Sequence, residues 1–444
     1  MRTLCLAALL AFAGITAQPA GAALITILAP AQGAELSGVV EVRASVTLEP
    51  GEDMTPPVAQ AADGWHTAMS EQADGTYSAE IDTDELPNGR QPIMVFMAPR
   101  GTDERREGYD DSSWAGDKFI AVADVSVLVR NPYRHYWGDL HAHTSYSDGA
   151  WLPGEAYDYA RSEAGLDFFA VTDHLEILTF EEYATTMIAA DAADEPGIFV
   201  ALYGVERTRC DTGHINFFMS PTHVLPYDLS DFYRALGQMG LLGHFNHPRM
   251  PDPEGGGRGN DFEHFRYAPE ADASMAMVEV RDAREEACYI ALLDNGWHVG
   301  AAGCEDKHEP TWGQGDTWTV ALARELTRES ILEALWSRRI YSAADRNLEL
   351  DFSLDGEDMG AQVSRPAGQY ACRVSLCDPD ADHRIQKIDL ILDGEVASTV
   401  EPGSATYQWE APVDLSAGQH YCFVRVTQTD ERMTWSSPIW VTAH

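Results

Sequence analysis

Between residues 136 and 308, the chain contains a series of short apolar runs that each end in side chains able to bind metal. These runs cover residues 136–143, 166–174, 198–206, 241–248, 277–282 and 298–308, and helical stretches lie between several of them. Apolar strands alternating with helices are typical of a parallel sheet that is covered on both faces. The pattern predicts a barrel or a doubly wound sheet whose carboxyl strand ends meet at one edge.

Sequence of β character flanks this region on both sides. Residues 40–48 alternate apolar and polar side chains, and Gly-containing turn pairs follow at the spacing of a small sandwich. After a helical stretch at 328–339, the chain becomes rich in β patterns again. We predict a signal peptide at 1–22, a β-sandwich at 23–130, an α/β region at 131–347 and a second β-sandwich at 348–444.

The first 22 residues have the features of a secretory signal. Arg2 precedes a short apolar run, and Ala20-Gly21-Ala22 offers small residues for cleavage. The run is too short to span a bilayer, and we found no longer apolar segment downstream. We therefore expect a secreted or periplasmic protein without membrane insertion.

An oxidising compartment permits disulfides among the cysteines. Cys372 and Cys422 occupy core-facing positions of two predicted strands, so they either bond across one core or stay buried thiols there. Cys210 could pair with Cys304 or Cys288.

The formal net charge of −41 limits the partners of the chain. It has 71 acidic and 30 basic side chains, and only Lys118, Lys307 and Lys387 are lysines. Such a surface repels nucleic acid and anionic lipid, so neither is an expected partner. We expect a small-molecule substrate, and we leave the oligomeric state open. An anionic substrate would need local positive charge, which bound metal ions could supply.

Polar residues at the predicted strand ends provide a dense set of metal ligands. His-x-His at 141–143 places two imidazoles on one face of a strand. A lone histidine at a strand end is usually a surface residue, but a whole set is hard to explain by chance. The set is larger than one tetrahedral ion needs, so we expect two or three ions. The candidate ligands are His141, His143, Asp148, His174, Glu206, His214, His247, Asp306 and His308.

The motifs HAHTSYSDG, VTDH, GVE followed by His214, NHP and EDKH, in this order, resemble those of the PHP (polymerase and histidinol phosphatase) superfamily of metal-dependent hydrolases. The most similar branch is that of carbaryl-hydrolase-like enzymes, and the stretch 326–350 also resembles that branch. The resemblance implies a distorted seven-stranded, TIM-like βα barrel flanked by Ig-like β-sandwiches. It further implies two or three zinc, manganese or iron ions.

The resemblance also implies how the ligands divide among the ions. One ion would take His141, His143, Glu206 and Asp306. A second would take Glu206, His214 and His247, and a third Asp148, His174 and His308. Some relatives have histidine at the position of Asp148, so whether the third ion position is occupied stays open. An extra residue in 303–306 leaves open whether Cys304 or Glu305 reaches the site.

A metal-bridging hydroxide could attack phosphorus or a carbonyl carbon, and a protonated neighbour would help the leaving group depart. His244, Asp173 and Lys307 are the candidate catalytic residues, although each could instead orient a ligand. Arg207, Arg209 and Arg249 could bind a phosphate, but a surface ion pair is the simpler interpretation of each. Residues 255–258 form a predicted loop. Asn246 could be a turn residue only.

Seven other histidines lack companions typical of metal sites, and we expect them to be exposed or structural. They are His66, His135, His223, His264, His383, His420 and His444.

The leading functional hypothesis is a metal-dependent phosphoesterase acting on a small molecule. The second is a hydrolase of carboxylic esters, amides or carbamates with the same metal centre. The third is a binding protein without catalysis, and the complete ligand set argues against it.

Overall fold

The computed structural model describes residues 24–48, 50, 54–61, 66–86, 89–97, 121–129, 132–250, 260–380 and 383–444. The predicted signal peptide and the predicted loop at 255–258 lie outside these residues. The chain divides into two compact units, Met1–Asn131 and Pro132–His444. The four predicted domain ranges stay predictions. Within the described part of the chain, no helix has both the length and the apolar character needed to cross a membrane.

The first unit contains two sheets. In one sheet the order is β1 (Leu24–Ala29), β3 (Val39–Thr47), β7 (Tyr77–Asp82) and β6 (Ser70–Glu71). In the other it is β2 (Glu35–Leu36), β9 (Ala121–Val129), β8 (Gly89–Met97), β4 (Val58–Gln60) and β5 (His66–Ala68). Val42 of β3 and Ile93 of β8 are fully buried in the same core, so the sheets pack as a sandwich.

The second unit is built around one long, mixed sheet. Its first strands in spatial order are β16 (Gly300–Ala302), β15 (Met275–Glu279), β14 (Leu242–Phe245), β13 (Ile215–Phe218), β12 (Val200–Arg207), β11 (Phe168–Val171), β10 (Arg134–Asp139), β17 (Trp318–Ala323) and β18 (Ile340–Ala343). Strands β10, β11 and β12 are parallel to one another, and so are β14, β15 and β16.

The expectation of an entirely parallel sheet is wrong at two places. Strand β13 runs antiparallel to both β12 and β14, because it returns from β12 through a short loop rather than through a helix. Strands β17 and β18 are also antiparallel to their neighbours. The ladder of the described strands does not close into the predicted seven-stranded barrel, since β16 pairs only with β15. A mixed α/β fold is confirmed.

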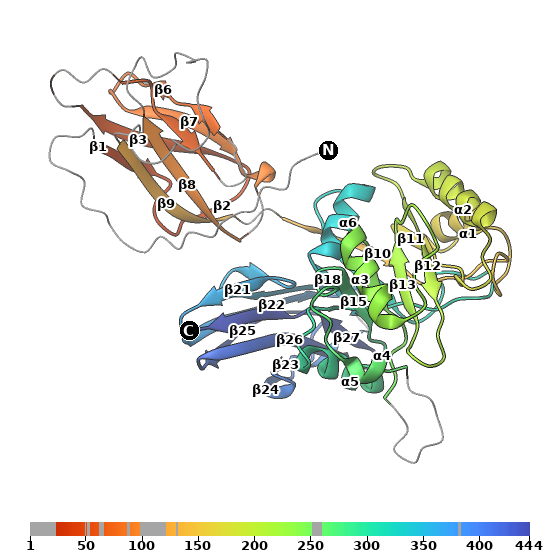
Figure 1. Cartoon of the computed structure of the whole chain (residues 1–444). Coiled ribbons are helices and arrows are strands. Elements are labelled where there is room, and N and C mark those ends of the chain that lie inside the picture. Colours follow the sequence, from red (N-terminus) through yellow and green to blue (C-terminus); the bar gives the residue numbers. More distant parts are fainter. Residues whose placement is uncertain are drawn as a thin grey trace. The chain divides into compact units, whose positions relative to one another are not determined.

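Among the residues that the structure describes, five helices have nine residues or more, and α1 and α2 lie beside β11 and β12 (Figure 1). They are α1 (Pro153–Ser162), α2 (Phe180–Ala193), α3 (Leu229–Met239), α5 (Ala283–Asp294) and α6 (Arg328–Trp336). Local sequence sets their ends: Asp228 caps α3 by accepting from two backbone N–H groups, and Gly240 ends it at φ 60°. Phe262–Phe265 forms only a short irregular turn, α4.

The C-terminal strands form a second sandwich that continues the long sheet, because β27 (Met433–Ser436) pairs with β18. The sheet continues with β26 (Gly418–Gln428), β23 (Ile385–Leu392) and β24 (Glu395–Val400), and β28 (Ile439–Ala443) and β21 (Gln362–Arg365) branch from it. The opposing sheet is β20 (Glu357–Asp358), β19 (Glu349–Leu354), β22 (Gly368–Cys377) and β25 (Thr406–Leu415).

Cys372 and Cys422 lie in the core between these sheets, which confirms that they face one core. A hydrogen bond between the two thiols, together with burial, raises the pKa of Cys422. Both are free thiols in the structure, and so are Cys210, Cys288 and Cys304, so no predicted pairing is formed there.

Candidate metal centre

The segment that follows β10 carries two buried imidazoles to the carboxyl edge of the sheet. His141 and His143 are both 0% exposed, and their Nε2 atoms lie 3.2 Å apart. Both Nε2 atoms face Asp306 Oδ1, at 3.3 Å from His141 and 3.1 Å from His143. Two ring nitrogens that converge on one carboxylate oxygen are the arrangement expected around a cation.

Glu206, at the end of β12, lies at the centre of the site and is 1% exposed. Its carboxylate oxygens lie between 2.7 and 3.6 Å from one nitrogen of each of five imidazoles. These belong to His141, His143, His174, His214 and His247. Burial alone would raise the pKa of Glu206, but His141 and the hydrogen bonds from the other imidazoles hold it well below its usual range.

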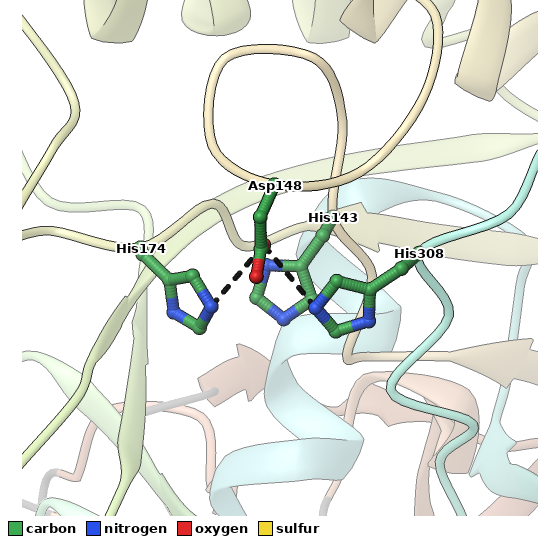
Figure 2. A group of neighbouring side chains, drawn as sticks. All are labelled: His143, Asp148, His174 and His308. Atoms are coloured by element: carbon green, nitrogen blue, oxygen red, sulfur yellow. Dashed lines mark ion pairs between the residues drawn. The ribbon is translucent and has the colours of Figure 1, made fainter.

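The ligand atoms form three groups, and within each group they all lie within 4.8 Å of one another. The groups are His143, Asp148, His174 and His308; His141, His143 and Asp306; and His141, Glu206 and His247. Figure 2 shows the first group, in which the Asp148 carboxylate lies between two imidazoles, 3.3 Å from His174 Nε2 and 3.2 Å from His308 Nε2. Asp148 therefore faces the proposed third ion position.

All nine predicted ligands lie in this one site. His214 belongs to none of the three groups, but its Nδ1 lies 3.1 Å from Glu206 Oε1. The segment with Asp306 and His308 follows β16 and lies beside the segment that follows β10, because the Lys307 carbonyl accepts the backbone N–H of His143 at 2.9 Å. Asp306 adopts a φ of 54°, so its carboxylate is positioned by a backbone conformation that is uncommon for aspartate.

The donor set fits divalent metal ions. Imidazole nitrogens and carboxylate oxygens are ligands that suit zinc, manganese and iron. Glu206 and Asp306 are held charged in a cluster of imidazoles, and a bound cation would replace protons as the balancing charge.

Three asparagines orient the ligands. Asn246, fully buried, donates through Nδ2 to Glu206 Oε1 at 2.9 Å and to Asn216 Oδ1 at 2.8 Å. Asn260 accepts the N–H of His214 at 2.8 Å, and its Nδ2 lies 2.9 Å from His247 Nδ1. Asn246 is thus more than a turn residue. Contacts of this kind fix the direction of first-sphere ligands.

Glu279, at the end of β15, was not predicted as a site residue. It is 0% exposed, accepts the His247 N–H at 2.7 Å, and its Oε1 lies 2.7 Å from His141 Nδ1. Burial would raise its pKa, but Arg281 and His141 outweigh that effect and hold the pKa below its usual value. A carboxylate on the Nδ1 side of His141 would leave Nε2 to face a bound ion. The only feature of the sequence that could have indicated Glu279 as a site residue is its position at the end of an apolar run.

The three candidate catalytic residues lie in different surroundings. Asp173 accepts from Thr144 N–H at 2.7 Å, Thr144 Oγ1 at 2.6 Å and Ser147 Oγ at 2.5 Å, so it holds the turn that carries Asp148. His244 is 0% exposed, neither ring nitrogen has a hydrogen-bond partner, and burial lowers its pKa to about 3. A neutral imidazole at this pKa is a poor proton donor near pH 7.

Lys307 is half-buried and lies between Asp306 and His308 in the chain. It interacts electrostatically with Glu305. Glu305 itself accepts the N–H groups of Gly313 and Gly315 and therefore braces a loop. Cys304 is 0% exposed and lies near Thr319 Oγ1, at 3.8 Å.

Two of the three arginines that could bind a phosphate, Arg207 and Arg209, contact protein groups instead. Arg207 is 1% exposed and donates to the carbonyls of Gly213, at 3.3 Å, and Tyr227. Arg209 pairs with Asp211 at 2.8 Å, and Arg249 is exposed. The ion-pair interpretation holds for Arg209. Arg207 is instead a buried structural residue that connects two loop segments through hydrogen bonds to their carbonyl groups.

The stability of the metal-free protein should fall as pH rises above about 6.5. Burial alone would lower the pKa values of His141, His174 and His247, but neighbouring carboxylates raise them above the ordinary 6.5. Raised histidine pKa values contribute stability that is fully present below the unfolded-state pKa and is lost as pH passes the folded-state values. Urea unfolding with a chelator, from about pH 6 to about pH 8, measures this slope.

Metal-loaded protein should show the opposite trend, because ions compete with protons for the same nitrogens and bind more tightly as pH rises. A metal-free protein whose free energy of unfolding is constant or rises across this range would contradict the assigned contacts. A His298→Asn variant is the control, since His298 pairs with Asp272 outside the site.

No protein-family model matches the chain. Among curated proteins, it is similar to an uncharacterized protein of Chlamydia pneumoniae, with 31% identity over 137 residues, and to one of Chlamydia trachomatis, with 26% identity over 137 residues. Each match covers 28% of this chain, and the chain spans only 22% of each relative.

Among solved structures, the chain is similar to a two-domain protein from Bacteroides vulgatus described as containing a predicted PHP-like metal-dependent phosphoesterase. The identity is 18% and the TM-score 0.40, covering 69% of this chain and 95% of that chain. A β-glucuronidase of Bacteroides uniformis matches with 10% identity and a TM-score of 0.21, covering 95% of this chain and 61% of that chain.

Proposed function

We propose that this protein is a metal-dependent hydrolase that cleaves a phosphoester of a small molecule and that works in the periplasm or outside the cell. The observation that carries the proposal is the position of Glu206, buried and within 3.6 Å of five imidazoles. Membership of the PHP superfamily, with its distorted barrel and its carbaryl-hydrolase-like branch, is part of the same proposal. It is supported by the motif order in the sequence.

The chain's own residues supply binding and orientation. His141, His143 and Asp306 would hold one ion, Glu206 and His247 with His214 a second, and Asp148, His174 and His308 a third. When bound, such ions polarise a substrate oxygen and make water a better nucleophile near neutral pH. Glu279 orients the His141 imidazole and Asn246 orients the Glu206 carboxylate, so that the ligand atoms of both face the ion positions.

Hydrolysis of a carboxylic ester, amide or carbamate is the second candidate, and two observations favour it. Arg207 and Arg209 are engaged with protein groups rather than directed to a phosphate. Apolar side chains are exposed close to ligands in the chain: Trp151 is 47% exposed three residues after Asp148, and Ile177 is 57% exposed three residues after His174. An uncharged substrate with an apolar part would suit such surroundings.

A metal analysis combined with a substrate panel tests the proposal. Protein expressed with ample zinc, manganese and iron should contain two or three ions per chain, and less than one ion would overturn both hydrolase candidates. p-Nitrophenyl phosphate, bis(p-nitrophenyl) phosphate, p-nitrophenyl acetate and an aryl carbamate then distinguish the reactions. Activity on the carbamate or acetate alone would favour the second candidate.

A His141→Ala, Glu206→Ala double variant should lose activity on whichever substrate is cleaved, by at least about 1000-fold, because it removes ligands of two ion positions. Hydrolysis that survives in this variant would show that the site is assigned wrongly. Its circular dichroism spectrum verifies that the fold is retained.

A further inference from the structure

A second group of potential ligands lies away from the site described above, where the α/β part of the second unit meets its C-terminal strands. Asp345 follows β18, Asp378 follows β22, and His383 precedes β23. Asp345 is 2% exposed and Asp378 3% exposed, and ligand atoms of the three residues lie within 4.8 Å of one another. His383 therefore has companions typical of a metal site, contrary to the expectation from the sequence.

A buried amide points into this group and has an unsatisfied oxygen. Gln428, the last residue of β26, is 1% exposed. Its Nε2 donates to Asp345 Oδ2 at 2.9 Å and to Asp378 Oδ2 at 2.8 Å, while its Oε1 is buried without a hydrogen-bond partner. A buried polar atom without a partner is costly, so its position in a folded protein calls for a ligand or a water.

A neighbouring amide repeats the pattern. Asn347 Nδ2 donates to Asp380 Oδ2 at 3.0 Å, and Asn347 Oδ1 is buried without a partner. The orientation of an amide is decided by its surroundings, because its oxygen and nitrogen differ little in size. Without a cation, each NH₂ group faces the carboxylates. With a cation among the carboxylates, half a turn of each amide would bring its oxygen to the ion and would place the NH₂ group where the unsatisfied oxygen now lies, where it could donate to water.

The charges around the group are strongly unbalanced. Burial raises the pKa of Asp378, and repulsion from Asp345 and Asp380 adds to the effect. The guanidinium of Arg432 lies 3.8 Å from Asp345 and 3.4 Å from Asp430, and the His383 imidazole lies 3.3 Å from Asp345. One arginine and one histidine thus face four carboxylates.

We propose that Asp345, Asp378 and Gln428, flanked by Asn347 and Asp380, form a structural calcium site. Calcium takes six to eight oxygen ligands, from carboxylates, amide carbonyls and water. This group offers mainly oxygens, whereas the hydrolase site offers mainly imidazoles, so the two sites select different ions. The calcium ion would join the ends of β18, β22 and β26 and so tie the α/β part to the C-terminal sandwich. The site is independent of the proposed hydrolase function.

Thermal unfolding of the full chain, with the imidazole-rich site first saturated with zinc, tests the proposal. Adding about 1 mM Ca²⁺, the range of extracellular calcium modules, should raise the Tm by about 5 °C. An Asp345→Asn, Asp378→Asn variant should show no calcium response and, with calcium removed, should unfold at or above the Tm of wild type, because the repulsion is gone. Glu395→Gln, an exposed acid on β24, is the matched control and should respond like wild type.

Three outcomes would overturn the proposal: no calcium-dependent rise in wild type, an equal rise in the double variant, or a rise with Mg²⁺ or further Zn²⁺ instead of Ca²⁺. Calorimetric titration of zinc-saturated wild type supplies a test that does not depend on the variant folding. One calcium ion per chain is expected, and no calcium binding contradicts the site. A His141→Ala variant should keep the calcium response, which separates this result from the fate of the hydrolase proposal.

Discussion

A Glu206→Gln variant is expected to lose bound metal and to lose hydrolytic activity with it. Glutamine keeps the shape of the side chain but removes the charge that faces five imidazoles, and its NH₂ group would point a donor at the ion position. Replacing outer-sphere partners of metal ligands costs about 10–100-fold in affinity, so the loss of this central carboxylate should exceed about 100-fold.

The measurement is metal content after dialysis, together with the rate on the substrate that the panel identifies. Glu286→Gln is the matched control: Glu286 is also buried, at 5% exposure, and pairs with Arg425 at 2.7 Å, away from the imidazoles. The control should lose stability but keep its ions. A Glu206→Gln protein that retains two ions and full activity would show that Glu206 is structural only.

The convergence of the nine candidate ligands could be predicted from the sequence because they occupy strand ends or the segments just beyond them. Strands β10, β11 and β12 are parallel neighbours, so His141, His174 and Glu206 necessarily meet at one edge. Strand order was not needed for this, only the direction of the strands. Strand β13 is antiparallel, contrary to the expected parallel sheet, but His214 still lies in the site. His214 precedes β13 and therefore lies opposite the end of β12, next to Glu206.

Asp173 and His244 were chosen as catalytic candidates because they are close to ligands in the sequence, but neither side chain faces the metal centre. The reason is geometric. Adjacent residues in extended backbone point to opposite sides. Asp173 is adjacent to His174, and its carboxylate turns to Thr144 and Ser147 instead of to the imidazoles. His244 lies within β14, between the apolar strands of the core, so its ring is enclosed rather than exposed to substrate.

Contacts between distant segments could not be predicted from the sequence. The group around Asp345 depends on strand ends that lie up to 83 positions apart along the chain. Asp378 and Asp380 lie just before His383 in the sequence, but its other partners, Asp345 and Asp430, follow β18 and β26 and are brought to it only by the fold. Glu279 was missed for a related reason: it ends a buried strand, and only the packing of β15 near His141 shows that its charge is balanced inside the protein.

The contact between Glu279 and His141 leads to the second large effect. A Glu279→Gln variant should bind metal about 10–100-fold more weakly, as is typical when a carboxylate behind a histidine ligand is removed. Glu279 would then be a positioning residue: it fixes which nitrogen of His141 carries the proton, so that Nε2 is free for the ion. The amide can still accept from the His247 N–H, but it no longer carries charge toward His141 or Arg281.

A merely structural role for Glu279 would lower stability without a specific change in metal affinity. Glu285→Gln separates the two roles, because Glu285 is the other carboxylate that pairs with Arg281, at 2.6 Å, and has no contact with His141. Competition with a chelator gives the metal dissociation constant of each variant, and urea unfolding of the metal-free forms gives their stability. We expect weaker metal binding in Glu279→Gln alone. Its binding should also depend less on pH, because Glu279 is one of the carboxylates that raise the pKa of His141, and without it fewer protons compete with the ion. Equal metal affinities in the two variants would show that Glu279 only balances the charge of Arg281 and does not orient His141.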